Sequence, residues 1–335
     1  MDFTLTDEQL LLRDSVEKFV ATNCDVARHR RLSASEPGFD PAAWAQFAEL
    51  GWLALPFAEE TGGLGGSTVD SMVIAQALGA GFVREPYLHT VVTCGGLLQR
   101  AGSAEQQARY IPAIIDGSAQ WAFACAERSA DFDLQRVDAA ADTAPEGYRL
   151  SGRKIAVLNG HCADHFIVSA NTQEGLGLFI VDAAAPGVQV EPFVALDGSR
   201  GALLAFSQLA LDSTALLGKP GDTGALEAAM DATIVAMGAE SLGAMQALLD
   251  ATVEYTQTRQ QFGQPISRFQ VLQHRMADMY MKVEETRSLL FNAAIACDSN
   301  AKARALECAA LKVKLAEAGR FVAQQAVQLH GGIGM

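Results

Sequence analysis

The chain has 335 residues, of which 50% are hydrophobic and 19% charged, and its formal net charge is −14. This length supplies a sizeable core and favours two or three subdomains, and the composition excludes an intrinsically disordered chain. The acidic balance and the lack of a long run of Lys or Arg argue against a nucleic-acid partner and predict a solvated surface.

The N-terminus and the cysteines bear on the cellular compartment. Six cysteines occur without a CxxC pair or a regular spacing, at positions 24, 94, 125, 162, 297 and 308. Residues 1–8 lack the cationic start and the apolar core of a signal peptide. No uninterrupted apolar run reaches the roughly 18 residues that a membrane helix requires. We therefore expect buried, reduced thiols, no membrane span and a cytoplasmic location.

The first third of the chain has a helical pattern. Thr6 and Gln9 have the spacing of a capping box, in which each side chain satisfies the other residue's free backbone N–H. Apolar residues then recur at helical spacing, at Leu12, Val16, Phe19 and Val20. Gly and Pro separate four further expected helices, over residues 42–50, 69–78, 89–101 and 104–115. Residues 1–118 are predicted to form a helical N-terminal domain.

The middle of the chain changes to short apolar alternations, which are typical of strands. They lie over residues 148–151, 165–170, 176–181, 188–193 and 203–209. Turn-forming pairs separate them, at Asn159-Gly160, Glu174-Gly175, Pro186-Gly187 and Asp197-Gly198. Residues 119–218 are predicted to form a β middle domain, a small barrel or sandwich.

The helical period returns at Gly224 in three long segments, over residues 224–258, 269–297 and 301–329. Their length and spacing are typical of antiparallel helices in a bundle. Residues 219–335 are therefore predicted to form a C-terminal helical bundle. Helices, then strands, then helices again indicate an α+β fold of packed subdomains.

Five segments, in order along the chain, resemble landmarks of the acyl-CoA dehydrogenase family. They are Asp2-Phe3-x-Leu5-Thr6-x-Glu8-Gln9, Leu50-Gly51-Trp52 with Glu59-Glu60-Thr61-Gly62-Gly63-Leu64-Gly65, Gly152-Arg153-Lys154 running to Asn159-Gly160, Arg259-x-x-Phe262-Gly263 with Phe269-Gln270, and Gln328-x-x-Gly331-Gly332-x-Gly334. Each alone is weak evidence. Together, each on the predicted element type, they identify the chain as resembling this family along its whole length.

The resemblance implies a helical N-terminal domain, a β middle domain and a four-helix C-terminal bundle, with FAD at the subunit boundary. The resemblance also implies the activity of the family, which oxidises an acyl-CoA thioester to its α,β-unsaturated form. A carboxylate removes the α proton, flavin accepts the β hydride, and electrons pass to an electron-transfer flavoprotein. A half-site for FAD implies at least a dimer, and closed symmetry favours a dimer of dimers.

The strongest part of the resemblance is the half-site for the ADP end of FAD. By family analogy, the cofactor-binding residues are Arg259, Phe262, Gly263, Phe269, Gln270, Gln328, Gly331 and Gly332. Arg259 can place a permanent charge and a fork of donors on a pyrophosphate. Phe262 offers an apolar face, and Gly331 and Gly332 let backbone N–H groups approach closely because they lack Cβ.

The half-site for the flavin ring departs from the family pattern. The family's flavin-bonding Thr corresponds to Ala126, and its Gly-Ser pair corresponds to Asp131-Phe132. The family's aromatic and its Thr or Ser beside the flavin correspond to Ala156 and Leu158. These contacts to the ring and the substrate are therefore missing together.

No catalytic residue is assigned from the sequence. Most family members carry the base as a Glu beyond the GGxG segment, and this chain ends at Met335. A minority carry it on an earlier helix, at a position that here is Thr233, beside Ile234 in place of a substrate-contacting Arg. Asp231 and Glu240 flank that position, but their helical offsets direct them to other faces. The six histidines show no metal-ligand spacing, so no metal site is expected.

Three functions fit these observations. The chain can be a homomeric acyl-CoA dehydrogenase whose C-terminal tail is missing. It can be a partner subunit of a heteromeric acyl-CoA dehydrogenase, of the kind found in sterol side-chain and related catabolism, in which this chain completes the ADP half of a shared FAD. It can also be a non-enzymatic scaffold that has lost FAD. The retained ADP half beside a degraded ring half favours the partner subunit.

Overall fold

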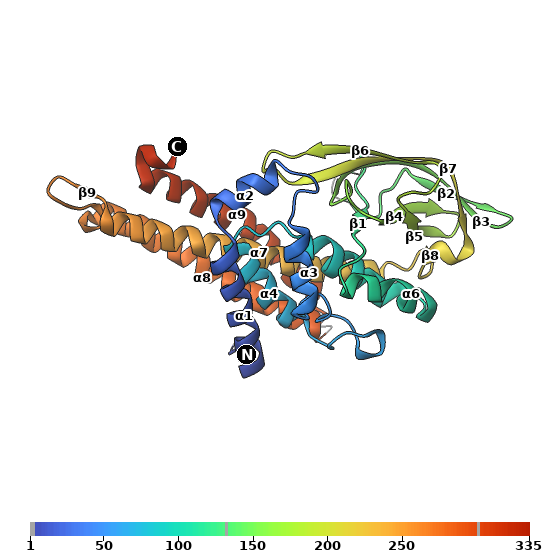
Figure 1. Ribbon diagram of the computed structural model, residues 1–335, viewed down its shortest axis with the longest axis horizontal. Helices are drawn as coiled ribbons and strands as arrows, with labels where there is room; N and C mark the ends of the chain where they lie inside the picture. Colours follow the sequence, from blue (N-terminus) through green and yellow to red (C-terminus); the bar gives the residue numbers. More distant parts are fainter. Residues whose placement is uncertain (1–3, 131–132, 300–301) are drawn as a thin grey trace. The chain divides into compact units, whose positions relative to one another are not determined.

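The computed structural model describes residues 4–130, 133–299 and 302–335. Its contacts divide the chain into two compact units (Figure 1). Unit 1 comprises Met1–Val26, Ser67–Val83 and Asp231–Met335, and unit 2 comprises Ala27–Gly66 and Arg84–Met230. Each unit thus joins segments that are distant in sequence. The three domains predicted from the sequence, with boundaries after residues 118 and 218, remain a prediction.

Unit 1 is helical. Its main elements are α1 (Asp7–Asn23), α4 (Thr68–Ala80), α7 (Gly224–Thr258, from Asp231 onward), α8 (Gln270–Asp298) and α9 (Arg304–His330). A short hairpin of β9 (Gln260–Gln261) and β10 (Gln264–Pro265) with the turn η4 (Ile266–Arg268) connects α7 to α8, and η5 (Gly331–Gly334) follows α9. The three long segments predicted after Gly224 are confirmed, and α1 and α4 complete the unit.

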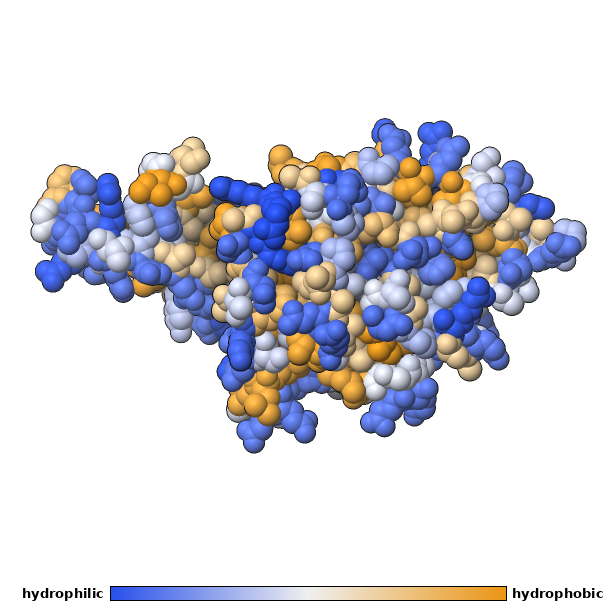
Figure 2. Space-filling model, viewed as in Figure 1, coloured by the Kyte–Doolittle hydropathy of each residue, from blue (hydrophilic) through white to orange (hydrophobic). Residues whose placement is uncertain are grey.

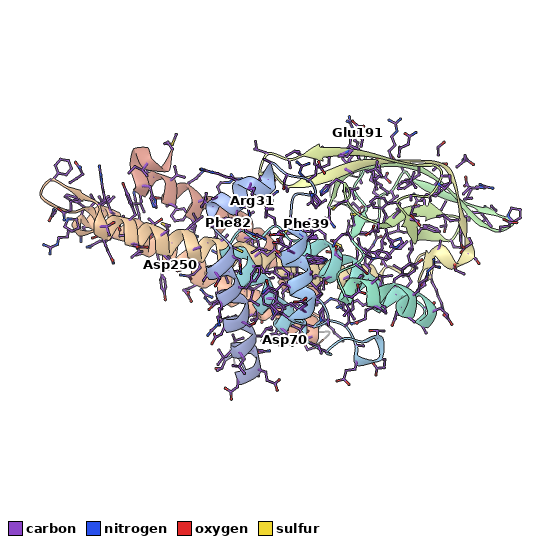
Figure 3. The ribbon with its side chains drawn as sticks, viewed as in Figure 1. Arg31, Phe39, Asp70, Phe82, Glu191 and Asp250 are labelled. Carbon is purple, nitrogen blue, oxygen red and sulfur yellow. The ribbon has the colours of Figure 1, made fainter. Side chains whose placement is uncertain are left out.

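Polar caps fix the starts of α1 and α4. The predicted capping box of α1 is present, since Thr6 Oγ1 accepts from Gln9 N–H at 3.2 Å and Gln9 Oε1 accepts from Thr6 N–H at 3.1 Å. Gln9 Nε2 also donates to Asp70 Oδ1 at 2.9 Å, which ties α1 to the first turn of α4 (Figure 3). Asp298 accepts from the Thr68 and Val69 N–H groups at 2.7 and 3.3 Å. The end of α8 therefore caps α4 from a distant part of the chain.

Helices α4 and α7 cross at two glycines. A Cβ added to Gly79 would lie 2.1 Å from the backbone oxygen of Glu240, and one added to Gly243 would lie 1.9 Å from the backbone oxygen of Gln76. Side chains cannot separate helices whose backbones touch in this way. The two glycines therefore set the distance between α4 and α7.

Helix α7 is long enough and apolar enough to cross a membrane, and among the described residues no other helix meets both criteria. Half of its most apolar stretch is buried, however. At Gly238 its surface comes within contact distance of Leu290, Leu311 and Leu315, on α8 and α9. An apolar helix enclosed by its neighbours is typical of a protein core, which weakens the membrane interpretation.

The half-buried Glu240 on α7 has no ion-pair or hydrogen-bond partner for its side chain among the described residues, and burial raises the pKa of its carboxyl from 4.5 to about 7. A raised carboxyl pKa means that the folded state holds the proton more tightly, so stability falls as the pH rises from about 4.5 to about 7. We expect Glu240→Gln to match the wild type at low pH and to exceed its free energy of unfolding by about 2 kcal/mol above neutrality.

Urea denaturation at several pH values checks this expectation. The control is Glu254→Gln, which removes a carboxylate from an exposed position later on the same helix. Equal pH profiles for wild type and Glu240→Gln would contradict the raised pKa.

Unit 2 combines short helices with a sheet. Its helical elements are α2 (Val26–Ser33, from Ala27 onward), α3 (Pro41–Glu49), η1 (Glu59–Thr61), η2 (Tyr87–Gly95), α5 (Gly96–Ala101), α6 (Ala104–Ile115) and η3 (Ser213–Ala215). The helix predicted over 89–101 is instead a π-helix, η2, followed by α5. Thr93 Oγ1 donates to the Leu88 carbonyl at 2.9 Å, five residues back, and so occupies a carbonyl within this wider turn.

The strands of unit 2 form one mixed sheet in the order β6-β7-β3-β2-β4-β5-β8, with β1 paired to β4. They are β1 (Trp121–Ala124), β2 (Ala140–Ala144), β3 (Gly147–Leu158), β4 (His165–Thr172), β5 (Gly175–Asp182), β6 (Val188–Val194), β7 (Arg200–Asp212) and β8 (Leu216–Leu217). The five predicted strands correspond to β3 to β7. Strands β1, β2 and β8 were not predicted, because they are short and lack a full alternation.

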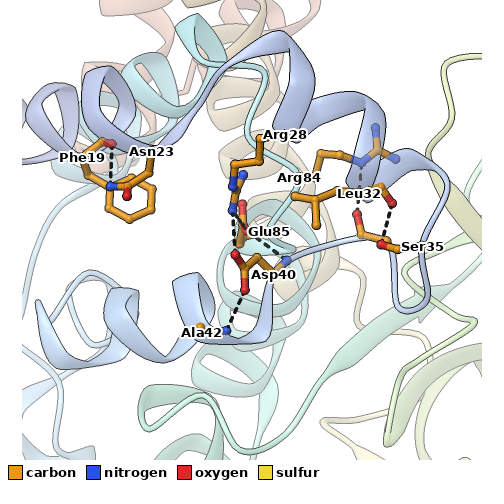
Figure 4. A network of polar contacts seen from close by, with 10 residues as sticks. Phe19, Asn23, Arg28, Leu32, Ser35, Asp40, Ala42, Arg84 and Glu85 are labelled. Atoms are coloured by element: carbon orange, nitrogen blue, oxygen red, sulfur yellow. Dashed lines mark hydrogen bonds and ion pairs between the residues drawn. The ribbon is translucent and has the colours of Figure 1, made fainter.

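A buried ionic network joins the first helices of unit 2 (Figure 4). Arg28 Nη2 on α2 lies 2.5 Å from Glu85 Oε1 and 3.8 Å from Asp40 Oδ2. Asp40 N–H donates to the same Glu85 oxygen at 3.1 Å, and Asp40 Oδ1 caps α3 through Ala42 N–H at 3.0 Å. The pairing offsets part of the cost of burying Glu85, whose side chain is fully buried.

Candidate cofactor site

The first sequence-predicted segment forms the tip of the β9–β10 hairpin. Phe262 and Gly263 occupy its turn with φ of 54° and 78°. Two successive positive φ values are typical of a type I′ turn, where glycine is favoured and a bulky residue is strained. Phe262 is 89% exposed. This side chain thus projects into solvent from a strained position, and its ring makes an edge contact with Phe269 at 6.0 Å between ring centroids.

Arg259 immediately precedes the hairpin. Its backbone is held, since its N–H donates to the Tyr255 carbonyl at 2.8 Å and its carbonyl accepts from Ile266 N–H at 2.9 Å. Its side chain is exposed, and the structure gives its guanidinium no partner among the described residues. A fixed backbone with a free cation can receive an anionic ligand without first breaking an ion pair.

The second segment ends α9. Gly331 caps the helix with φ of 62°, and residues 331–334 form a turn that is largely exposed. A Cβ added to Gly263, Gly331 or Gly332 would meet nothing within 4 Å. Positive φ explains Gly263 and Gly331, but no neighbour among the described residues requires a glycine at 332. Its bare backbone leaves room for a molecule that approaches from outside.

The two segments lie at the same end of unit 1 (Figure 1). The rings of Tyr255 on α7 and His330 on α9 stack with centroids 4.4 Å apart and planes 23° from parallel. His330 Nδ1 lies 2.8 Å from the Ala326 carbonyl, which orients the imidazole. Figure 2 shows hydrophobic surface at this end of the chain, where Ile333 and Met335 are 68% and 98% exposed.

The remaining predicted residues flank these segments. Gln270 begins α8 with an exposed side chain, directly after the half-buried Phe269. Gln328 lies exposed in the last turn of α9. Together these residues fit an ADP group. The pyrophosphate can pair with the Arg259 guanidinium and accept from the open backbone N–H groups of Gly331 and Gly332, and the adenine can lie against the Phe262 ring.

The other predicted half-site lies on β3 and the segment after β1, in unit 2. Ala126 is held by its carbonyl, which accepts from Ile155 N–H at 2.9 Å. Ala156 has φ of 50° at a register irregularity of β3, and Leu158 is 40% exposed. None of these three side chains can donate or accept a hydrogen bond. Asp131-Phe132 lies outside the described residues.

A buried ion pair, which was not predicted, lies next to these residues in the sequence and holds β3 to the segment after β1. Lys154 Nζ lies 2.6 Å from Glu127 Oε1, and the two side chains are 0% and 4% exposed. Glu127 also accepts from the Asp138 and Ala139 N–H groups at 2.6 and 3.1 Å, and Lys154 donates to Ser169 Oγ at 3.0 Å. Burial lowers the pKa of Lys154, and the hydrogen bond that Lys154 donates to Glu127 opposes the shift.

A cleft of about 850 Å³ opens beside this pair. Its walls come from β3, β6 and β7, and both signs of charge line it, since Arg128 and Arg153 are lining residues. Glu191, labelled in Figure 3, is another. No sequence pattern indicates the pair or the cleft, because Glu127 and Lys154 are 27 residues apart and each resembles an ordinary surface charge.

The candidate positions for a catalytic base are on α7. Thr233 and Ile234 carry no carboxylate. Asp231 is mostly buried and its Oδ2 lies 2.7 Å from Arg304 Nε, so it is held as a structural anion. Glu240 is the carboxyl with the raised pKa described above. Among the described residues, no group of three or more His, Cys, Asp or Glu side chains could hold a metal ion.

Comparisons with known proteins agree with this geometry. Family models of the acyl-CoA dehydrogenase N-terminal, middle and C-terminal domains match residues 6–118, 122–213 and 224–335. Acyl-CoA dehydrogenase FadE27 of Mycobacterium tuberculosis is 32% identical over 344 residues, which cover 100% of this chain and 90% of FadE27.

Two solved structures extend the likeness to three dimensions. The ChsE4–ChsE5 complex from Mycobacterium tuberculosis is 31% identical with a TM-score of 0.91, covering 100% of this chain and 89% of the other. PigA with FAD and proline is 27% identical with a TM-score of 0.92, covering 100% of this chain and 90% of the other. The domain matches and the FadE27 likeness over the whole sequence lead to one conclusion: the chain belongs to the acyl-CoA dehydrogenase family of FAD-dependent oxidoreductases.

Proposed function

We propose that this chain completes the ADP half of an FAD shared with a partner subunit, in an assembly that dehydrogenates an acyl-CoA thioester at its α,β bond. The observation that supports this proposal is the free Arg259 and the strained, exposed Phe262, at the same end of unit 1 as the open turn after His330. Among the described residues, the Arg259 guanidinium has no partner and the Phe262 ring makes an edge contact with Phe269. They fit a ligand held by another chain.

The roles of the residues follow from their chemistry. Arg259 forms a charge-assisted pair with the pyrophosphate, and Phe262 covers one face of the adenosine. The backbone N–H groups of Gly331 and Gly332 donate to the same anion at close range. FAD, when bound, supplies the hydride acceptor, and an electron-transfer flavoprotein then takes the electrons.

The ring half supports a division of labour between two chains. The side chains of Ala126, Ala156 and Leu158 cannot hydrogen-bond to the flavin, and Ile234 cannot hold a substrate by charge as an arginine can. We therefore assign the flavin-ring contacts and the base to the partner subunit, and a dimer of dimers to the assembly. A heteromeric relative is known, since ChsE4 and ChsE5 form a complex. A homomeric enzyme and a scaffold without FAD are the alternatives.

Copurification separates these functions. The chain is purified alone and with the acyl-CoA dehydrogenase-like product of a neighbouring gene, and flavin absorbance and acyl-CoA oxidation with an artificial acceptor are recorded. We expect flavin and activity only in the co-complex. Full flavin occupancy and activity in the chain alone would establish the homomeric enzyme, and no flavin in either sample would establish the scaffold.

Substitution of Arg259 tests the ADP half directly. We expect Arg259→Gln to weaken FAD binding to the assembly by about 10-fold to 100-fold, because one charge-assisted contact to the pyrophosphate is lost. Fluorescence titration of the stripped complex with FAD measures the Kd. The control is Arg320→Gln, which removes an exposed arginine from α9 and changes the net charge by the same amount. Equal Kd values for the two variants would exclude Arg259 from the site.

The state of the cysteines supports a cytoplasmic location. All six are free thiols, as in proteins of reducing compartments. The expectation that all are buried was wrong: Cys94 and Cys308 are buried, whereas Cys24, Cys125, Cys162 and Cys297 are partly exposed. Their surroundings decide the difference, since an isolated cysteine carries no periodic signal in the sequence.

A further inference from the structure

Two cysteines of unit 1 meet where α8 and α9 run side by side. Cys297 lies in the last turn of α8 and Cys308 in the second turn of α9, and their sulfur atoms are 3.7 Å apart. A disulfide needs a sulfur separation of about 2.05 Å. The gap can close through small side-chain rotations, because the two thiols already face each other.

The surroundings hold both residues in place. Asn292 Nδ2 donates to Glu307 Oε2 at 2.5 Å between the same two helices. Asp298, next to Cys297, caps α4 through Thr68 and Val69. Arg304, one turn before Cys308, pairs with Asp231 at 2.7 Å. These contacts fix the backbone on both sides of the thiol pair, so little ordering is needed to join the sulfur atoms.

The two thiols differ in their exposure to solvent. Cys308 is fully buried, whereas Cys297 is partly exposed. The hydrogen bond from Cys308 lowers the pKa of the Cys297 thiol, and the same contact together with burial raises the pKa of Cys308. A partly exposed thiol that accepts a hydrogen bond from a buried thiol is the arrangement of an attacking and a resolving cysteine.

We propose that Cys297 and Cys308 form a reversible disulfide when the protein meets hydrogen peroxide. The Cys297 thiolate attacks one peroxide oxygen, the O–O bond breaks, and the released hydroxide takes a proton to become water. The sulfenic acid on Cys297 is then attacked by the Cys308 sulfur. The S–S bond forms, the S–O bond breaks, and the hydroxide leaves with the Cys308 proton as a second water. Two thiols are oxidised and one peroxide is reduced.

The disulfide would join the end of α8 to the start of α9. Cys308 Sγ also lies 3.8 Å from the Asp231 carbonyl, so the link would form beside the part of α7 that enters unit 1. This end of the helices is opposite the Tyr255–His330 stack. The modification therefore acts on the far end of unit 1 from the proposed FAD contacts, and its test does not depend on them.

Trypsin makes the link directly visible. Cleavage after Arg287, Lys302, Arg304 and Lys312 places Cys297 and Cys308 in separate peptides, residues 288–302 and 305–312, with one cysteine each. The full-length protein, in its purified assembly, is treated with hydrogen peroxide, denatured, alkylated with iodoacetamide and digested. We expect the two peptides to appear joined, and dithiothreitol to separate them. Both peptides fully alkylated after peroxide treatment would overturn the proposal.

Variants then assign the two roles. In Cys308→Ser we expect a sulfenic acid on Cys297 that dimedone traps, and in Cys297→Ser we expect Cys308 to stay reduced. Cys24→Ser, which removes another partly exposed thiol, is expected to retain the joined peptides. Dimedone on Cys308 in place of Cys297 would contradict the assignment. The joined peptides are measured in the unsubstituted chain, so the main result does not require any variant to fold.

Discussion

Replacing Lys154 by Met is expected to lower the free energy of unfolding by about 3–5 kcal/mol, because it leaves the Glu127 carboxylate buried without its counter-charge. Glu127 is 4% exposed and would keep only two backbone N–H donors, from Asp138 and Ala139. Met fills nearly the same volume as the lysine stem, so packing changes little. Urea denaturation followed by circular dichroism measures the effect.

The matched control is the double variant Lys154→Met/Glu127→Gln. It removes both charges, and the Gln oxygen can still accept one of the backbone N–H groups. We expect it to regain at least about half of the lost stability, since a buried pair removed as a whole costs far less than one partner removed alone. If the two substitutions were simply additive, the pair would not be coupled and the argument from burial would be wrong.

Gly243→Ala is expected to cost about 3 kcal/mol of unfolding free energy, at the upper end of the usual range for overpacking. The new methyl would lie 1.9 Å from the Gln76 carbonyl oxygen and 2.8 Å from the Ala80 nitrogen, both on α4. Backbone atoms cannot rotate away, so α4 and α7 must move apart. That movement would loosen contacts along the whole crossing.

Gly319→Ala provides the control for this effect. Gly319 lies inside α9, and a Cβ there meets nothing within 4 Å. Here alanine should stabilise by about 0.5–1 kcal/mol, because it is a better helix former than glycine. Thermal unfolding of both variants in parallel compares the two. A Gly243→Ala variant as stable as the wild type would show that the helices do not touch at this point.

The sequence predicted the elements well where periodicity is strong. The helix over 104–115 agrees with α6 and the segment over 224–258 with α7. The helices–strands–helices order and the acyl-CoA dehydrogenase fold are confirmed. The π-helix η2 was not predictable in the same way, because the wider turn at Thr93 depends on local hydrogen bonds and not on apolar spacing.

The candidate site was predicted only in part. The segments around Arg259 and Gly331 were found from motifs, and their role in binding FAD remains the proposal made above. The exposure of Phe262 and the stacking of Tyr255 on His330 became visible only in three dimensions. Motif spacing identifies which residues belong together, but it does not say which of them the chain's own fold leaves without a partner.

By itself, the sequence determined the family, the type of most elements and the residues proposed for the ADP half, because local periodicity and motif spacing are written along the chain. The tertiary structure decided the pairs made between separate segments: Lys154 with Glu127, Asp298 with the start of α4, Cys297 with Cys308, and α4 with α7. Each pair depends on two backbones meeting in space, and a linear pattern contains no information about that distance.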